Sequence, residues 1–121
     1  MRARFAPDGR TVVYDAAWNG GASDVFSVRI GDQGSTAHGL PNWLLLSLSS
    51  AGEMAVRENA NGGGSTYATR LARVPLSGGT PRVIIDEVTD GDWEPNGDRL
   101  AVAHGVKGCH STGVSAWTRA L

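Results

Sequence analysis

The sequence predicts an all-β protein built from antiparallel four-stranded β-propeller blades, and three observations support this fold class. First, residues 5–9 and 93–97 share one turn phrase: an aromatic residue, any residue, Pro, Asp or Asn, and Gly. A degenerate copy occupies residues 48–52. Second, the turn glycines lie 43 and 45 residues apart, which is the repeat length of a four-stranded blade. Third, alternating apolar residues follow the turns, as in half-buried strands.

The turn phrase has the residue types of a tight β-hairpin. Pro fixes φ at the second turn position, Asp or Asn suits the third, and Gly adopts the left-handed conformation that follows. The middle copy keeps only Gly52, so we expect a looser turn there that still forms. Turn chemistry explains the whole phrase, which therefore predicts structure rather than a ligand site.

The remaining strands follow from apolar alternation between turn signals. A shift of 46 residues places Phe26, Val28 and Ile30 on Ala72, Val74 and Leu76, so the repeat extends beyond the turn. A partial first blade over residues 1–40 has expected strands at 1–5, 11–18, 24–30 and 36–40. A complete blade over residues 41–87 has strands at 43–49, 54–58, 67–76 and 82–87. The start of a third blade over residues 88–104 has strands at 88–93 and 99–103.

Two segments depart from simple alternation. Residues 43–49 are nearly all apolar, which predicts an inner strand buried on both faces. From residue 105 the alternation fails, so we expect an irregular tail over residues 105–121.

With these residues in place, the chain resembles the TolB-type, WD-repeat-like β-propeller family. The likeness rests on the turn phrases at residues 5–9 and 93–97 and on the run Leu-Ser-Gly-Gly-Thr-Pro at residues 76–81. It is most similar to the propellers fused to bacterial serine/threonine protein kinases, in which runs like residues 73–82 occur. The resemblance covers about residues 5–103 and implies a propeller that belongs to a larger multidomain protein.

Length limits what this chain can build by itself. Its 121 residues hold about two and a half blades, whereas closed propellers have about four to eight. Three interpretations stay open: part of a longer chain that supplies the remaining blades, a homo-oligomer that completes a ring, or an open stack with exposed strand edges.

Composition excludes some partners and leaves the compartment undetermined. A net charge of −1 gives no basic patch for nucleic acid or an anionic membrane. The longest apolar run, residues 43–48, is too short to cross a bilayer, and the chain shows no signal peptide. Cys109 is the single cysteine, so no intrachain disulfide forms.

Two groups of side chains have the residue types of a metal site. Asp90, Asp92 and Glu94 alternate along an expected inner strand, and oxygen-rich faces accept Ca²⁺. One strand supplies only part of a coordination shell, so we interpret them as a solvated polar face. His104, Cys109 and His110 lack the fourth ligand of a zinc site and fall at the start of the tail or within it. We predict no metal and no cofactor.

Aromatic side chains supply the other binding candidates. Trp18 stands beside a Gly-rich turn and is the best loop candidate for contact with a ligand, whereas Trp43 and Trp93 are expected to pack between blades. With Asp90 and Asp92, Trp18 completes our set of weak binding candidates.

No catalytic constellation is evident in the sequence. It has no Gly-x-Ser-x-Gly elbow and no kinase motif. We therefore expect a non-enzymatic protein-interaction or ligand-sensing scaffold. Two alternatives remain: the propeller that gates a peptidase resembling prolyl oligopeptidase, and a self-assembling propeller lectin.

Overall fold

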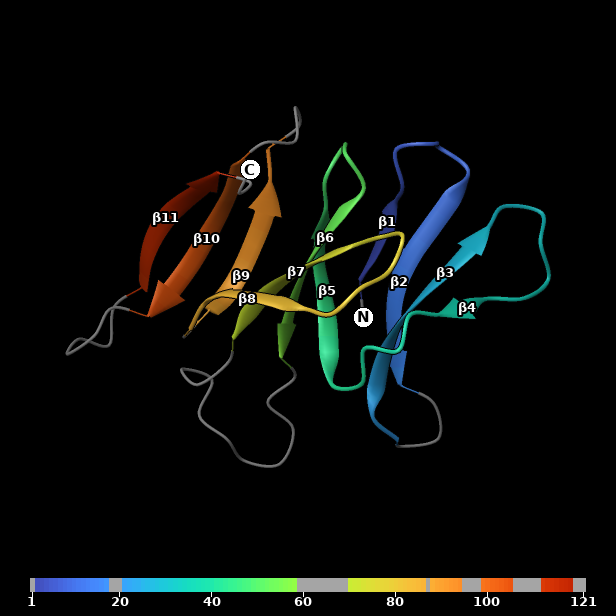
Figure 1. Ribbon diagram of the computed structural model, residues 1–121, viewed down its shortest axis with the longest axis horizontal. Coiled ribbons are helices and arrows are strands. Elements are labelled where there is room, and N and C mark those ends of the chain that lie inside the picture. The colour runs from blue at the N-terminus through green and yellow to red at the C-terminus, as the bar shows by residue number, and fades with distance from the viewer. Residues whose placement is uncertain are drawn as a thin grey trace.

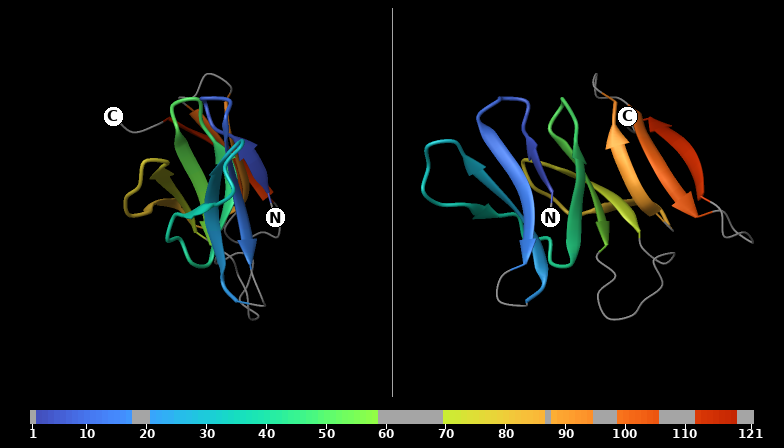
Figure 2. Two further views of the ribbon diagram at one scale, coloured as in Figure 1. Left: turned by 90° about the vertical axis from the view of Figure 1, so that its right-hand side faces the viewer. Right: turned by 180° about the vertical axis from the view of Figure 1, so that it is seen from behind.

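The structure is a computed structural model that describes residues 2–17, 21–58, 70–86, 88–94, 99–105 and 112–118. These residues form eleven strands in three antiparallel sheets, which lie side by side along the long axis of the molecule (Figures 1 and 2). Within them, no helix is long and apolar enough to cross a membrane. The predicted all-β fold with antiparallel four-stranded sheets is confirmed.

Each sheet is one blade, and its strands are neighbours in chain order. The first blade contains β1 (Ala3–Phe5), β2 (Thr11–Ala17), β3 (Ser23–Arg29) and β4 (Thr36–Ala37). The second blade contains β5 (Trp43–Leu48), β6 (Glu53–Glu58), β7 (Leu71–Pro75) and β8 (Arg82–Ile85). The third blade contains β9 (Val88–Trp93), β10 (Arg99–Gly105) and β11 (Thr112–Thr118).

The first turn shows why its phrase contains Asp and Gly. Gly9 has a φ of 68°, in the left-handed region that favours glycine. The Asp8 carboxylate accepts hydrogen bonds from the backbone N–H groups of Arg10 (2.8 Å) and Thr11 (2.9 Å) and from the Thr11 hydroxyl (2.8 Å). These bonds lower the pKa of Asp8 below its usual 3.8, because they stabilise the ionised carboxylate.

The degenerate middle turn has the same backbone conformation as the first turn, but a different side chain accepts its hydrogen bonds. Gly52 has a φ of 80° and donates to the carbonyl of Ser49 (3.0 Å), as Gly9 does to Ala6 (3.0 Å). The Ser49 hydroxyl accepts from the N–H groups of Ala51 (3.2 Å) and Glu53 (2.9 Å). A buried serine therefore performs here the capping that Asp8 performs in the first turn.

The second blade is buried on both faces, as its nearly continuous apolar inner strand predicts. A register shift between Leu45 and Ser47 marks an irregularity in β5. Leu45 packs into the core shared with the first blade, and Leu46 packs into the core shared with the third. Two apolar cores thus join the three blades. The first contains Val13, Val25, Leu40, Leu45, Met54, Val56, Ala72 and Val74; the second contains Leu46, Ala55, Leu71, Val88, Trp93, Leu100 and Val102.

The expectation of an irregular tail over residues 105–121 is wrong for residues 112–118. These residues form β11, which pairs with β10 along its whole length, from Arg99 opposite Thr118 to Gly105 opposite Thr112. Among the residues that the structure describes, the third blade therefore extends past residue 104 and contains three strands. Sequence reasoning missed β11 because Gly, Ser, Thr and Ala dominate the segment, whereas backbone hydrogen bonding to β10 needs no apolar alternation.

Candidate functional site

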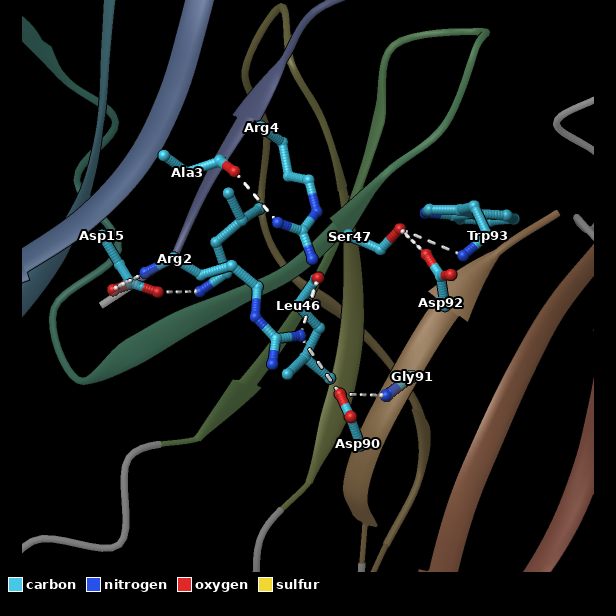
Figure 3. A network of polar contacts seen from close by, with 11 residues as sticks. Arg2, Ala3, Arg4, Asp15, Leu46, Ser47, Asp90, Gly91, Asp92 and Trp93 are labelled. Atoms are coloured by element: carbon cyan, nitrogen blue, oxygen red, sulfur yellow. Dashed lines mark hydrogen bonds and ion pairs between the residues drawn. The ribbon is translucent and has the colours of Figure 1, made fainter. Parts of the chain in front are cut away.

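The inner strands of the three blades, β1, β5 and β9, lie next to one another, with β5 in contact with both of its neighbours. Charged and hydroxyl side chains gather along this row and connect the blades (Figure 3). We define the inner row as Arg2, Arg4, Ser47, Asp90 and Asp92. Within this row the proposed binding residues Asp90 and Asp92 contact side chains from other blades.

Arg2 is the longest bridge of the inner row. Its guanidinium Nη1 donates to the backbone carbonyl of Leu46 (3.1 Å) and to the carboxylate of Asp90 (3.2 Å), and so reaches from the first blade across β5 to the third (Figure 3). The side chains of Arg2 and Asp90 are 36% and 58% exposed. Because water screens such a pair, its contribution to stability is small, about 0–1 kcal/mol. Both groups remain accessible to a partner.

Asp15 fixes the backbone of Arg2 through a hydrogen bond. Asp15 is a buried residue, 3% exposed, and its carboxylate accepts hydrogen bonds from the backbone N–H groups of Arg2 (3.1 Å) and Leu45 (2.8 Å). One carboxylate thereby fixes β1 and β5 relative to β2. The hydrogen bonds that it accepts offset the cost of burying this polar group.

Ser47 makes the corresponding connection between the second and third blades. Its hydroxyl donates to Asp92 (2.7 Å) and accepts from the backbone N–H of Trp93 (3.0 Å). The side chain of Trp93 is buried in the core between these two blades, as expected for packing between blades. Trp43 is partly buried against the other core, which agrees with the same expectation.

The acidic candidates occupy the predicted strand but do not converge. Asp90 and Asp92 alternate along β9 and are both exposed, whereas Glu94 pairs with Arg99 (3.1 Å). Within the described ranges, no three His, Cys, Asp or Glu side chains come together as metal ligands would. Instead, Asp90 binds Arg2, and Asp92 binds Ser47.

Several other candidates fall where no side chain is described. Trp18, Cys109 and His110 lie outside the described residues, and only the backbone of His104 is described, within β10. Sequence reasoning also overlooked Arg2, Asp15 and Ser47. The available signal was weak: a basic residue on the first inner strand and acids on the third, which only an alignment of the blade repeats relates to each other.

A hollow of about 190 Å³ lies on the face of the third blade that points away from the second. Its lining combines two carboxylates with small apolar residues: Asp90, Gly91, Asp92, Ala101, Val102 and Ala103. The hollow is open to solvent, and Ala101 at its floor is exposed. The two carboxylates beside small apolar residues favour a positively charged group at this surface.

The comparisons with known proteins concern the fold. No protein-family model matches this sequence, and no curated protein is significantly similar to it. Among solved structures, the crystal structure of TolB from Acinetobacter baumannii is similar to this chain with a TM-score of 0.73 and 13% sequence identity. The match covers 96% of this chain and 29% of that protein, so the chain spans less than a third of the length of TolB.

The fold therefore defines the class of protein: a TolB-like β-propeller segment of three blades. At 13% identity the similarity establishes the fold alone.

Proposed function

We propose that this chain is a non-catalytic β-propeller segment that serves as a protein-interaction scaffold, with the inner row as its binding surface. The observation that carries the proposal is the partly exposed pair of Arg2 and Asp90, which are held in place by different blades. A donor and an acceptor fixed in this way match the polar groups of an extended peptide.

The rigidity of the row supports this function. Asp15 and Ser47 tie the inner strands together through buried or partly buried hydrogen bonds, so the charged groups above them are positioned before a partner arrives. A surface that is ordered in advance loses less conformational entropy on binding. Specificity then comes from the arrangement of charges, which also accelerates association.

A selection from random displayed dodecapeptides tests the proposal, because the partner is unidentified. We expect the protein to enrich peptides that carry Lys or Arg, and Asp90→Asn to weaken their binding about tenfold, a loss of one interfacial charge pair. Asp32→Asn is the matched control, since Asp32 is exposed in the loop between β3 and β4 of the first blade. Rising salt should weaken the wild-type complex.

Two outcomes would overturn the binding surface. The first is the absence of any enriched peptide. The second is enrichment of peptides that bind Asp90→Asn as tightly as wild type. If Asp32→Asn lost binding equally, the effect would come from net charge rather than from the inner row.

We also propose that the scaffold belongs to a larger bacterial protein with a kinase catalytic domain. The support is the resemblance of residues 73–82 to the Arg-Val-Pro-Leu-x-Gly-Gly-x-Pro-Arg run of kinase-fused propellers. The coding sequence on either side of these residues provides the test. Upstream Gly-x-Gly-x-x-Gly and His-Arg-Asp motifs would support a kinase, whereas a downstream Gly-x-Ser-x-Gly elbow would replace it with a gated peptidase.

A further inference from the structure

Arg4 is a cation of the inner row that pairs with no carboxylate among the described residues. Its guanidinium Nη1 donates to the backbone carbonyl of Ala3 (3.0 Å), and the residue is exposed. Arg2, by contrast, pairs with Asp90 at 3.2 Å, so these two charges neutralise each other. A guanidinium has five N–H donors, and one bond to a described residue leaves most of those of Arg4 available to a ligand.

The register of the first blade directs Arg4 toward the second blade. Arg4 lies opposite Val13 in the pairing of β1 with β2, and cross-strand partners share one face of a sheet. Val13 is fully buried in the core that the first two blades share, so Arg4 lies on the face next to the second blade. In the view of Figure 3, its side chain extends from β1 toward β5 and Ser47. The charge of Arg4 therefore lies at a junction of two described blades.

Ser47 and Asp92 occupy, in the next two blades, the register position that Arg4 occupies in the first. The Ser47 hydroxyl donates its proton to Asp92 (2.7 Å) and accepts from the backbone N–H of Trp93 (3.0 Å). It therefore has no proton left for a ligand, and its effect is to hold the Asp92 carboxylate at the junction of the second and third blades.

The inner row thus carries opposite charges on its first and third strands. Arg4 and Asp92 are both exposed, and they make no ion pair with each other. A ligand that crosses the row meets a cation, a neutral hydroxyl and then a carboxylate. Charge complementarity favours a ligand with an acidic group beside Arg4 and a basic group beside Asp92.

The acidic group that fits Arg4 best is a carboxylate. A planar guanidinium binds carboxylate and phosphate in the same bidentate manner. The carboxylates of Asp90 and Asp92 on the same row repel a phosphate, with its charge of about −1.5 to −2 at pH 7, more strongly than they repel a singly charged carboxylate. An acidic side chain is therefore favoured over a phosphorylated one.

We propose that Arg4 selects an acidic residue in the extended peptide that the inner row binds, while the carboxylates of β9 bind its basic residue. This inference rests on the proposed function and adds a second requirement to it: the peptide carries both charges, at a constant separation along its chain. Arg4 is then a residue that determines specificity.

The dodecapeptides enriched by the wild-type protein provide the probes. We expect them to contain an Asp or Glu at a constant separation from the Lys or Arg. Selection on Arg4→Gln should still enrich basic peptides, but without the acidic residue. Arg10→Gln is the matched control, because Arg10 is exposed in the turn between β1 and β2 and the substitution removes the same charge. The control should select the same peptides as wild type.

A double-mutant cycle on one enriched peptide tests the contact itself. Fluorescence anisotropy of the labelled peptide gives its Kd, and the same peptide with its acidic residue replaced by the corresponding amide is the second probe. We expect the amide peptide to bind wild type about tenfold more weakly, and Arg4→Gln to weaken the acidic peptide by the same factor. Arg4→Gln should leave the Kd of the amide peptide unchanged, because the contact is already absent.

The outcomes separate this inference from the proposed function. Basic peptides that depend on Asp90 but bind wild type and Arg4→Gln equally would overturn the role of Arg4 and leave the binding surface intact. An amide peptide that binds wild type as tightly as the acidic one would overturn it as well, whatever the stability of the variant. If no peptide is enriched, both proposals fail.

Discussion

The carboxylate of Asp15 accepts a hydrogen bond of 2.8 Å from the backbone N–H of Leu45, and so joins the second strand of the first blade to the inner strand of the next. Leu45 is itself 1% exposed, within the core that these two blades share. A polar anchor and an apolar core therefore act on the same residue. The anchor sets the position of β5, and the core supplies the burial that stabilises it.

Replacing the anchor should destabilise the fold. We expect Asp15→Ala to lower the free energy of unfolding by about 1–3 kcal/mol, because it removes the acceptor for a buried backbone N–H. Urea denaturation followed by circular dichroism measures this difference. Asp32→Ala removes an exposed carboxylate and should change stability by no more than about 0.5 kcal/mol. Equal effects of the two substitutions would contradict the anchoring role.

The strand order could be predicted from the sequence because turn chemistry is local. Gly9 and Gly52 occupy the left-handed positions that the phrase requires, and the strands after these turns begin at Thr11 and Glu53, close to the predicted starts at residues 11 and 54. The irregularity at Leu46 could not be predicted, because it depends on two neighbouring leucines entering different cores. β11 was missed for the related reason that pairing, not side-chain pattern, defines it.

The candidate site was less predictable than the fold. Asp90 and Asp92 were found from their alternation on one strand, but their partners, Arg2 and Ser47, lie 88 and 45 residues away in sequence. Composition alone cannot show which charges meet across blades. Once blade repeats are aligned by register, however, Arg4, Ser47 and Asp92 fall on one position, and that alignment is the signal a sequence analysis can use.

Gly91 lies on β9, against the neighbouring strand β10 and near Leu46 of the second blade, and its replacement should destabilise the fold. A Cβ added there would meet the Ala101 carbonyl oxygen at 3.3 Å and the Leu46 Cδ1 atom at 3.6 Å. We expect Gly91→Ala to lower the free energy of unfolding by about 1–2 kcal/mol, because a backbone oxygen cannot yield easily. Gly34→Ala is the matched control, since no atom lies within 4 Å of a Cβ at that loop position. Thermal denaturation should separate the variants, and a neutral Gly91→Ala would contradict close packing around Gly91.

The first turn should lose stability in acid. The pKa of Asp8 lies below 3.8 because the ionised carboxylate accepts bonds from the N–H groups of Arg10 and Thr11 and from the Thr11 hydroxyl. The stabilisation is therefore fully present above pH 3.8 and disappears as the pH falls through the lower folded-state pKa. Carboxyl NMR titration should place the pKa of Asp8 below 3.8, and a value at or above it would contradict the turn geometry. Asp8→Asn keeps a neutral acceptor, so its turn should not respond to this titration.

His38 should make the fold less stable on mild acidification. Burial of its ring disfavours the protonated form and lowers its pKa below 6.5, although the nearby Asp24 carboxylate partly opposes the shift. The unfolded chain therefore binds a proton at a higher pH than the folded chain does. As a result, the free energy of unfolding falls as the pH drops from 6.5 toward the folded-state pKa. Below that pKa both states are protonated, and His38 causes no further loss of stability. The ring Nε2 lies 3.0 Å from the Ser27 hydroxyl, which helps to hold the ring in place. Proton NMR titration of the His38 ring should give a pKa below 6.5, and His38→Gln should flatten the dependence of urea midpoint on pH in that range. An unshifted pKa, or the same slope in His38→Gln and wild type, would show that burial of this ring does not control the response.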